Sequence, residues 1–352
     1  MSPSSSFSSL PVDIVLEILA RVPKRYHPTL SCVSKNFCLL LRSPEIHKIR
    51  SLRRRDSLFI CFLATTNKGQ VPHWFTLRRA ENNPRENHFV SIDLTFPCQT
   101  EQQPCVVALG PELFFICGSV YPSSTMWVLD SRTGTFRQGP SSRAARIYLS
   151  VGVVGSKVYV MGVYRSDDEI NVESFDVKTQ TWELAHVPED QDWWRSAAAT
   201  VSLNRKVCVP RFSDNAIKCY DTRDGSCESL DCPTKGEFLC RTGACVMNNV
   251  LYVYYARFGL MWFDSEMRLW RVVNGLTHLN NRRSVAVAEY YGKLAFLWEE
   301  EVGVSGETKE VWCRMIALER SEGEVRGIAE APQLLGSVPR WYRLQYCLSV
   351  SD

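Results

Sequence analysis

A repeat of about 45 residues limits the fold of this chain more than any other feature of its sequence. In each of five segments an apolar run leads into a two-residue turn, and a second apolar run follows. Glycine and asparagine at the turns accept the positive φ angle that a tight β-hairpin requires. Successive turns are 45, 49, 44 and 44 residues apart, and they lie near Gly110, Gly155, Asn204, Asn248 and Gly292.

A second landmark follows each hairpin at nearly the same period. An acidic residue is followed six positions later by a large or apolar residue, and the successive aspartates are 46, 45 and 43 residues apart. Two landmarks in phase predict four strands per repeat, as in one blade of a β-propeller. The pairs are Asp130/Phe136, Asp176/Trp182, Asp221/Cys227 and Asp264/Trp270, with a weaker fifth copy at Glu319/Val325.

The repeat therefore predicts a mainly β chain that forms a propeller of about six four-stranded blades. A unit from Leu58 to Ala80 lacks clear marks and is the expected sixth blade. Near the C-terminus apolar residues alternate strictly, which is typical of a half-buried strand. We expect this strand to close the ring onto the first blade, and its apolar residues are Tyr342, Leu344, Tyr346, Leu348 and Val350.

The region before the repeats has a helical rhythm instead. The segment LPVDIVLEILARVP predicts a helix with Pro11 and Asp13 in its first turn and Pro23 after its end. Apolar residues lie on nearly every side of this helix, and a module of some forty residues cannot enclose it with its own core. Part of the apolar surface must therefore contact a second protein or the propeller. Ser34 is the expected N-cap of a further helix.

The bulk composition favours an intracellular protein. Net charge is +3, from 41 basic and 38 acidic residues, so no strong field favours nucleic acid or a membrane surface as a partner. The 14 cysteines are scattered through apolar, strand-like runs, where free cysteine behaves as a small buried hydrophobe. The N-terminus has no secretory signal pattern, and no apolar stretch is long enough for a membrane span. We expect reduced thiols and a place in the cytoplasm, the nucleus or both.

Motifs for enzyme chemistry are absent from the sequence. There is no Gly-x-Ser-x-Gly elbow, no P-loop and no dinucleotide fingerprint. Acidic runs such as Glu299 to Glu301 read as solvated connecting loops. The best metal candidate has a spacing unlike that of zinc sites, so core packing is the expected role of Cys227, Cys232, Cys240 and Cys245. We expect no catalytic residue, no metal and no cofactor.

The N-terminal module resembles an F-box. The resemblance covers residues 10 to about 50 and rests on LPxDxxxEILxRVP, then on Val33-Ser34-Lys35 and Ser43-Pro44-Glu45. The repeats resemble degenerate kelch repeats, especially those of the plant F-box/kelch proteins. Kelch blades usually carry a Gly-Gly pair after the second strand, and here only Gly118 and Gly162 remain singly at that place. We therefore expect a disordered tail at residues 1–9, an F-box at 10–52 and a kelch-like propeller at 57–352.

The resemblance implies a non-catalytic adaptor of a ubiquitin ligase. An F-box protein of this kind binds a Skp-family adaptor, which joins a cullin and a RING protein, and its propeller presents a target protein for ubiquitination. The alternatives are a kelch scaffold outside any ligase and a kelch-propeller oxidase, for which the six histidines do not occupy matching blade positions. About half of the apolar F-box residues could instead fill the core of the module. Carried over by position, the docking surface comprises Leu10, Pro11, Ile14, Val15, Ile18, Leu19, Val22, Leu30 and Val33.

The target-binding residues are harder to predict. Trp193, Trp194 and Arg195 follow a polar stretch between two blade signals, and tryptophan and arginine dominate binding hot spots. The competing interpretation is that one of the two tryptophans begins a strand and packs between blades. The acidic segment from Glu299 to Glu310 is the alternative recognition surface.

Overall fold

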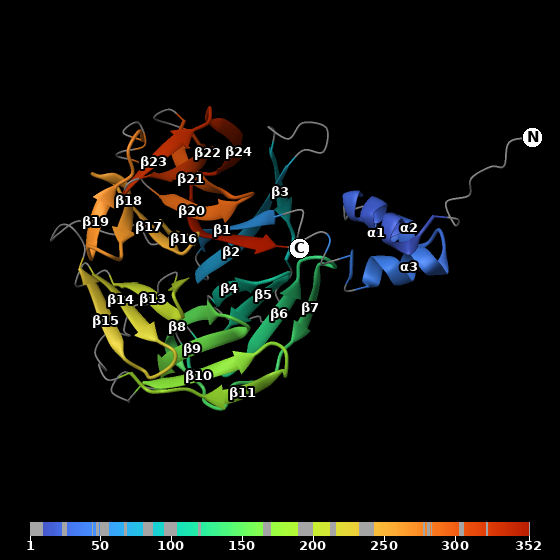
Figure 1. Ribbon diagram of the computed structural model, residues 1–352, viewed down its shortest axis with the longest axis horizontal. Coiled ribbons are helices and arrows are strands. Elements are labelled where there is room, and N and C mark those ends of the chain that lie inside the picture. Colours follow the sequence, from blue (N-terminus) through green and yellow to red (C-terminus); the bar gives the residue numbers. More distant parts are fainter. Residues whose placement is uncertain are drawn as a thin grey trace, which may run out of the picture.

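The chain folds into a small helical module followed by a six-bladed β-propeller (Figure 1). The computed structural model describes residues 10–22, 27–43, 45–46, 49, 56–66, 69–79, 87–94, 104–118, 121–164, 170–188, 200–211, 216–231, 243–276, 279, 282, 284–302, 306–321 and 323–351. The helices are α1 (Val12–Arg21), α2 (His27–Ser31) and α3 (Lys35–Arg42). No helix of these residues has the length and apolar character that a membrane crossing demands.

Each blade is an antiparallel sheet whose strands follow one another in the chain, except in blade one. Blade one comprises β25 (Tyr342–Ser351), β1 (Asp56–Thr66), β2 (Gly69–Arg79) and β3 (Asn87–Ile92). Blade two comprises β4 (Cys105–Leu109), β5 (Glu112–Ile116), β6 (Met126–Asp130) and β7 (Thr135–Gln138). Blade three comprises β8 (Ile147–Val154), β9 (Lys157–Val163), β10 (Asn171–Asp176) and β11 (Thr181–Leu184).

The remaining blades follow the same order. Blade four comprises β12 (Val201–Leu203), β13 (Lys206–Arg211), β14 (Ala216–Asp221) and β15 (Cys227–Asp231). Blade five comprises β16 (Ala244–Met247), β17 (Val250–Tyr255), β18 (Gly259–Asp264) and β19 (Leu269–Val272). Blade six comprises β20 (Val285–Tyr290), β21 (Lys293–Glu301), β22 (Thr308–Ser321) and β23 (Glu324–Ala329), with β24 (Gln333–Pro339) as a fifth strand on β22.

The last strand closes the ring, as the sequence predicts. β25 pairs antiparallel with β1, and the innermost strands of the six blades contact one another in a closed circle. The strict alternation of β25 is interrupted, however, because a β-bulge leaves Gln345 unpaired opposite Cys61 and Phe62. Leu344 packs toward blade six, whereas Val350, beyond the bulge, packs toward blade two. Both faces of the strand therefore contact neighbouring blades, and most of its described residues are half-buried.

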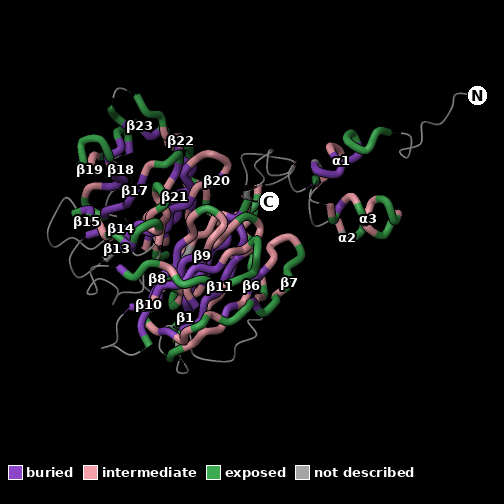
Figure 2. Tube along the Cα trace, turned by 60° about the horizontal axis from the view of Figure 1, so that its bottom comes forward, coloured by how far each residue is buried: buried purple, intermediate pink, exposed green. Residues whose placement is uncertain are grey.

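The hydrophobic core is divided among the interfaces between neighbouring blades. Six clusters of buried side chains fill the six interfaces of the ring. Burial is greatest in the middle strands of a blade, as in β5 and β17, and the outermost strands β7 and β11 are mostly exposed (Figure 2). Tryptophans of two outer strands also join blades by hydrogen bonds, because Trp182 Nε1 donates to Pro140 O at 2.8 Å and Trp270 Nε1 to Asp231 O at 2.8 Å.

The two landmarks of the repeat lie at hairpin turns. Gly110, Gly155, Asn204, Asn248 and Gly292 have φ angles between 50° and 70°, as predicted. In blades two to five the aspartates lie at the turn between the third and fourth strands, where a carboxylate oxygen accepts from the backbone N–H two residues later. These bonds measure 2.9, 2.8, 3.0 and 3.1 Å for Asp130, Asp176, Asp221 and Asp264.

Blade six departs from the predicted pattern in two ways. β22 is 14 residues long, so Glu319 lies inside the strand opposite Arg326, and the turn comes later, at Gly323. The weak fifth copy of the landmark is therefore not a turn residue. Glu299 to Glu301 lie at the end of β21 and not in a loop, because β21 pairs with β22 up to Lys309.

The surviving single glycines make room for a crossing backbone. A Cβ at Gly118 would lie 2.2 Å from the carbonyl oxygen of Arg146, and one at Gly162 would lie 2.8 Å from that of Ile147. The Arg146 side chain is only 1% exposed and pairs with buried Glu173 at 2.8 Å. Both glycines therefore permit the close packing of the segment that enters blade three.

Candidate protein-docking surfaces

Local sequence signals determine the helices of the N-terminal module. α1 begins after Pro11, whose φ of −55° suits the N-cap position, and Asp13 lies in its first turn. The helix ends at Arg21, where the N–H of Val22 bonds to Leu19 O, and Pro23 follows in the sequence. α3 begins at the predicted cap, because Ser34 Oγ accepts from the N–H of Phe37 at 3.1 Å.

One face of α1 forms the core of this module. Val15, Leu16, Leu19 and Ala20 are buried against α3 and the residues after it, where Leu41 and Ile46 are also buried. Two residues of the predicted docking surface, Val15 and Leu19, therefore fill the interior of the module. Ile18, Val22 and Leu30 of that predicted surface are half-buried.

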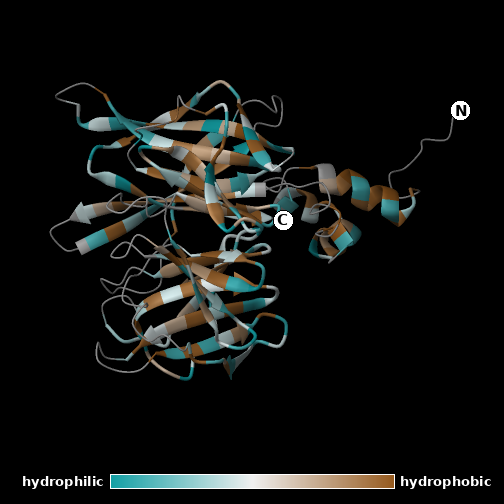
Figure 3. Cartoon of the chain, turned by 60° about the vertical axis from the view of Figure 1, so that its left-hand side comes forward, coloured by the Kyte–Doolittle hydropathy of each residue, from teal (hydrophilic) through white to brown (hydrophobic). Residues whose placement is uncertain are grey.

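A second set of apolar side chains remains in solvent. Leu10 is 38% exposed and Ile14 43%, and Pro11 and Val33 of the predicted surface are exposed as well. The structure adds two apolar side chains that the predicted surface lacks, Val12 at 62% and Leu39 at 69%. Hydrophobic segments are visible on the helices of the module in Figure 3. Helical periodicity places Val12 on the same face as Val15, which is buried. Val12 is exposed because the buried part of α1 begins only at Val15, so the periodic pattern alone could not identify Val12 as a surface residue.

The propeller exposes aromatic side chains on one of its two faces. In blade one the second strand, β1, begins at the face where β25 ends, because Asp56 pairs with Ser351. The second strands of the other blades begin at this same face, because the blades repeat one strand order around the ring. The ends of these second strands, and the starts of the innermost strands, therefore lie at the opposite face, which we term the distal face. The strongly exposed aromatic residues among those described all lie at such positions: Tyr121, Tyr148, Tyr164 and Trp341.

The predicted target-binding residues lie elsewhere in the chain. Trp193, Trp194 and Arg195 fall outside the described residues and stay a prediction. Several glutamates of the alternative acidic surface have basic partners in the structure. Glu299 binds Lys309 at 2.7 Å, both being less than 10% exposed, and Glu301 binds Arg340 at 3.2 Å. Sequence reasoning did not single out the exposed aromatic residues of the distal face, although Tyr121 and Tyr164 are 43 residues apart, close to one period of the repeat.

The cysteines of the metal candidate do not meet in the described structure. Cys227 lies in β15 and packs at the interface of blades three and four, whereas Cys245 lies in β16 at the interface of blades five and six. Burial raises the pKa of the Cys245 thiol to about 12, so this side chain is protonated at neutral pH. Cys232 and Cys240 fall outside the described residues. The described side chains include no group of three histidine, cysteine or acidic residues arranged for a metal ion.

A helical module with exposed apolar residues and a six-bladed ring of this repeat define an F-box protein with a kelch-type propeller. Comparison with known families agrees, since residues 7–49 match the F-box domain and residues 74–333 match the FKB95, Kelch-repeats domain. The chain belongs to the F-box/kelch-repeat family. This pairing of domains supports a substrate-adaptor role, and the F-box implies binding to a Skp-family adaptor.

Similar full-length proteins occur in Arabidopsis thaliana. The F-box/kelch-repeat protein At2g44700 is 51% identical over 346 residues, which cover 98% of this chain and 92% of the relative. The F-box/kelch-repeat protein At2g44630 is 49% identical over 362 residues, covering 100% and 95%. The similarity therefore extends over both the F-box and the propeller.

Proposed function

We propose that this chain is the substrate-recognition subunit of a Skp–cullin–F-box ubiquitin ligase. Its F-box binds a Skp-family adaptor, through which a cullin and a RING protein join, and its propeller binds a target protein for ubiquitination and degradation. Within the complex the chain itself is non-catalytic, and it acts in the cytoplasm, the nucleus or both. The observation that carries the proposal is the set of apolar F-box side chains that the module leaves in solvent, at Leu10, Val12, Ile14, Val33 and Leu39.

The separation of two surfaces supports this division of labour. The chain passes from the F-box into β1 at one face of the propeller, and the exposed aromatic residues lie at the distal face. Aromatic side chains are enriched in protein interfaces because each buries a large area with little loss of side-chain entropy. An adaptor on the F-box and a target on the distal face would therefore not compete for the same surface.

Replacement of two exposed F-box anchors tests the adaptor contact. We expect Leu10→Ala with Ile14→Ala to weaken binding to a purified Skp-family adaptor about thirtyfold or more, because a hot-spot anchor contributes about 2 kcal/mol. Binding is measured by calorimetry with full-length protein. Both side chains are exposed, so the melting temperature is expected to stay unchanged.

The matched control carries the same two substitutions on the propeller. Ile328 and Leu334 are 47% and 44% exposed, close to the exposures of Ile14 and Leu10, so Ile328→Ala with Leu334→Ala is expected to bind the adaptor normally. Undiminished binding by the F-box variant would reject the docking surface. Adaptor binding without co-purification of a cullin would instead favour the scaffold alternative.

A further inference from the structure

A pocket of about 350 Å³ opens between blades five and six. Its walls come from the last residues of β21, the first half of β22 and the connection that leads from blade five to blade six. β21 ends at the distal face, so the pocket lies on the side of the ring opposite to the start of β1. The residues that matter for its chemistry are Arg282, Trp298, Glu300, Trp312, Arg314 and Pro332.

Two indole rings form its apolar wall. Trp298 and Trp312 stand opposite each other in the pairing of β21 with β22, and their rings are nearly parallel, with centroids 6.2 Å apart. Both indole N–H groups already have acceptors, since Trp298 donates to Glu300 at 3.1 Å and Trp312 donates to Glu310 at 3.0 Å. The rings therefore offer only their apolar surfaces to a ligand.

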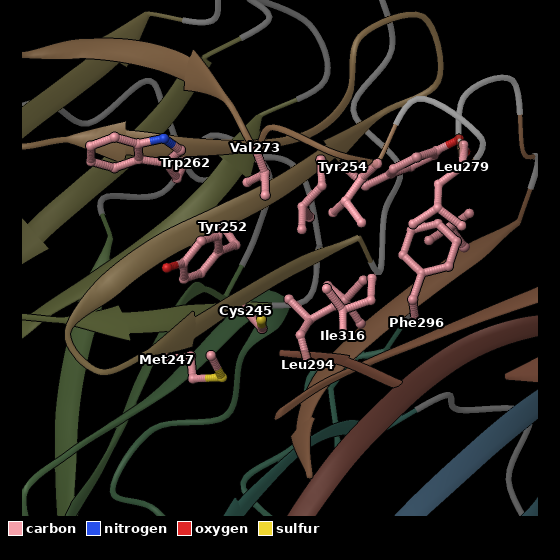
Figure 4. Close-up of a cluster of buried hydrophobic side chains, with 14 of the residues drawn as sticks. Cys245, Met247, Tyr252, Tyr254, Trp262, Val273, Leu279, Leu294, Phe296 and Ile316 are labelled. Carbon is pink, nitrogen blue, oxygen red and sulfur yellow. The ribbon is translucent and has the colours of Figure 1, made fainter. Parts of the chain in front are cut away.

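A buried tyrosine of blade five holds the connection between blades five and six in place. The hydroxyl of Tyr254 donates to Leu279 O at 2.9 Å and accepts from the N–H of Arg282 at 2.8 Å. Tyr254, Leu279 and Phe296 lie together at one end of the buried cluster of this interface (Figure 4). Arg282 is thus anchored by its backbone, and its guanidinium lies over the Trp298 ring, 5.1 Å from the centroid.

The two arginines of the pocket differ in their partners. Arg282 forms an ion pair with Glu300. The side chain of Arg314 makes no hydrogen bond or ion pair with any residue that the structure describes, and its Nε is a buried donor without an acceptor. Burial, and then the nearby charge of Arg282, lower the pKa of Arg314, yet a guanidinium stays protonated at neutral pH. A buried donor of this kind gains free energy when a ligand supplies an acceptor.

We propose that this pocket receives an acidic side chain of the target protein, with its carboxylate on Arg314 and a neighbouring apolar side chain against Trp312. Charge complementarity favours one carboxylate over a phosphate group, because Glu300 and Glu310 lie beside the rings and would repel a dianion. The proposal rests on the proposed function, since it names the class of segment that the propeller of the adaptor recognises.

A peptide array tests the pocket without knowledge of the target. The probes are immobilised ten-residue peptides with random flanks and a fixed central pair, which is Glu-Leu, Gln-Leu, phosphoserine-Leu or Lys-Leu. We expect the full-length protein to bind the Glu-Leu set about tenfold more than the Gln-Leu set, as a charge-assisted hydrogen bond implies. Arg314→Gln is expected to bring this ratio to about one, and Trp312→Ala to weaken both sets together.

Arg320→Gln is the matched control. Arg320 also lies on β22 with its guanidinium over a tryptophan, Trp262, but outside the pocket, so this variant is expected to keep the wild-type ratio. The wild-type protein can also be measured at high salt. Because salt screens the charge interaction, the preference for Glu-Leu is expected to shrink while binding of Gln-Leu stays constant.

Three results would overturn the inference: no preference for Glu-Leu in the wild-type chain, a preference that survives in Arg314→Gln, or stronger binding to phosphoserine-Leu. Adaptor binding is measured on the same samples. If one of these three results occurs while adaptor binding is normal, only the proposal for the pocket is rejected. If the wild-type chain fails to bind the adaptor, the proposed function is rejected.

Discussion

The F-box and the propeller carry the same kinds of apolar side chain but bury them to different extents. In the propeller, leucines, valines and phenylalanines fill six inter-blade clusters, because every blade has a neighbour on each side. The described F-box has one small cluster around Leu19 and leaves Val12, Ile14 and Leu39 in solvent. A ring of blades can bury a large share of its apolar surface, whereas a small helical module buries a smaller share. Apolar substitutions should therefore affect stability in the propeller and binding on the F-box surface.

The largest expected effect comes from opening the ring. Deletion of residues 342–352 removes β25, so β1 loses its inner partner and two inter-blade clusters lose Leu344 and Val350. We expect the truncated protein to aggregate and to lose its cooperative melting transition, since unpaired strand edges associate with one another. Differential scanning calorimetry provides the measurement. The control is Trp341→Ala, at an exposed position beside the deletion, which should melt like the wild type. A truncated protein that also melts like the wild type would contradict the closure of the ring by β25.

The next effect concerns a buried ion pair beside the closing strand. Glu299 binds Lys309 at 2.7 Å, and its other carboxylate oxygen accepts from the N–H of Leu344 at 2.8 Å. Glu299→Ala leaves Lys309 buried without its partner, so we expect a loss of about 3–5 kcal/mol in the free energy of unfolding in urea. Glu301→Ala is the control, because its pair with Arg340 is exposed and should contribute less than about 1 kcal/mol. Equal effects of the two variants would contradict this account.

Within the F-box, two aliphatic residues of α1 sharpen the comparison. Leu19 is 2% exposed, and Leu19→Ala should destabilise the module by about 2–5 kcal/mol and lower the helical circular dichroism signal. Ile14 is 43% exposed, and Ile14→Ala should change stability by less than about 0.5 kcal/mol. Both variants should bind the adaptor more weakly while the propeller melts normally. A stable Leu19→Ala module would mean that its core lies elsewhere.

The smallest effect concerns a hairpin turn of the propeller. Hydrogen bonds from Arg223 lower the pKa of Asp221 from its ordinary value of 3.8 to about 2. A lowered folded-state pKa means that the ionised carboxylate adds stability above its unfolded pKa, and that this contribution is lost as the pH falls toward 2. Because Arg223 is largely exposed, Asp221→Asn should cost about 1 kcal/mol or less at pH 7, with the difference from wild type shrinking below about pH 4 in urea titrations.

The control for this turn is Asp176→Asn. Asp176 accepts the same turn hydrogen bond, from the N–H of Lys178 at 2.8 Å, but no arginine follows it in the turn. An asparagine side chain can still accept that bond. We expect this variant to show a smaller and less pH-dependent change, and identical pH profiles for both variants would contradict a role for the Arg223 ion pair.

The elements that the sequence predicts well are those determined by near neighbours in the chain. The hairpin turns at Asn204 and Asn248 follow from the φ angles that asparagine tolerates, and the turn at Asp221 from a hydrogen bond two residues away. The bulge at Gln345 could not be predicted, because it depends on how β25 meets Cys61 and Phe62, nearly three hundred residues earlier. The long β22, which moves Glu319 out of a turn, likewise depends on its partners.

The candidate docking surfaces show the same division. The sequence alone identifies the F-box and the ring, because a helical period with excess apolar residues and two landmarks in phase are properties of the chain itself. Only the tertiary structure separates Ile14 from Leu19, since burial depends on where α3 packs. Only the ring brings Tyr121, Tyr164 and Trp341 to one face and sets Arg314 beside Trp298 and Trp312. Tyr121 and Tyr164 do lie about one repeat apart, but Trp341 and the pocket residues follow no such spacing. The physical reason is that strand pairing and closure join parts of the chain that no local preference relates.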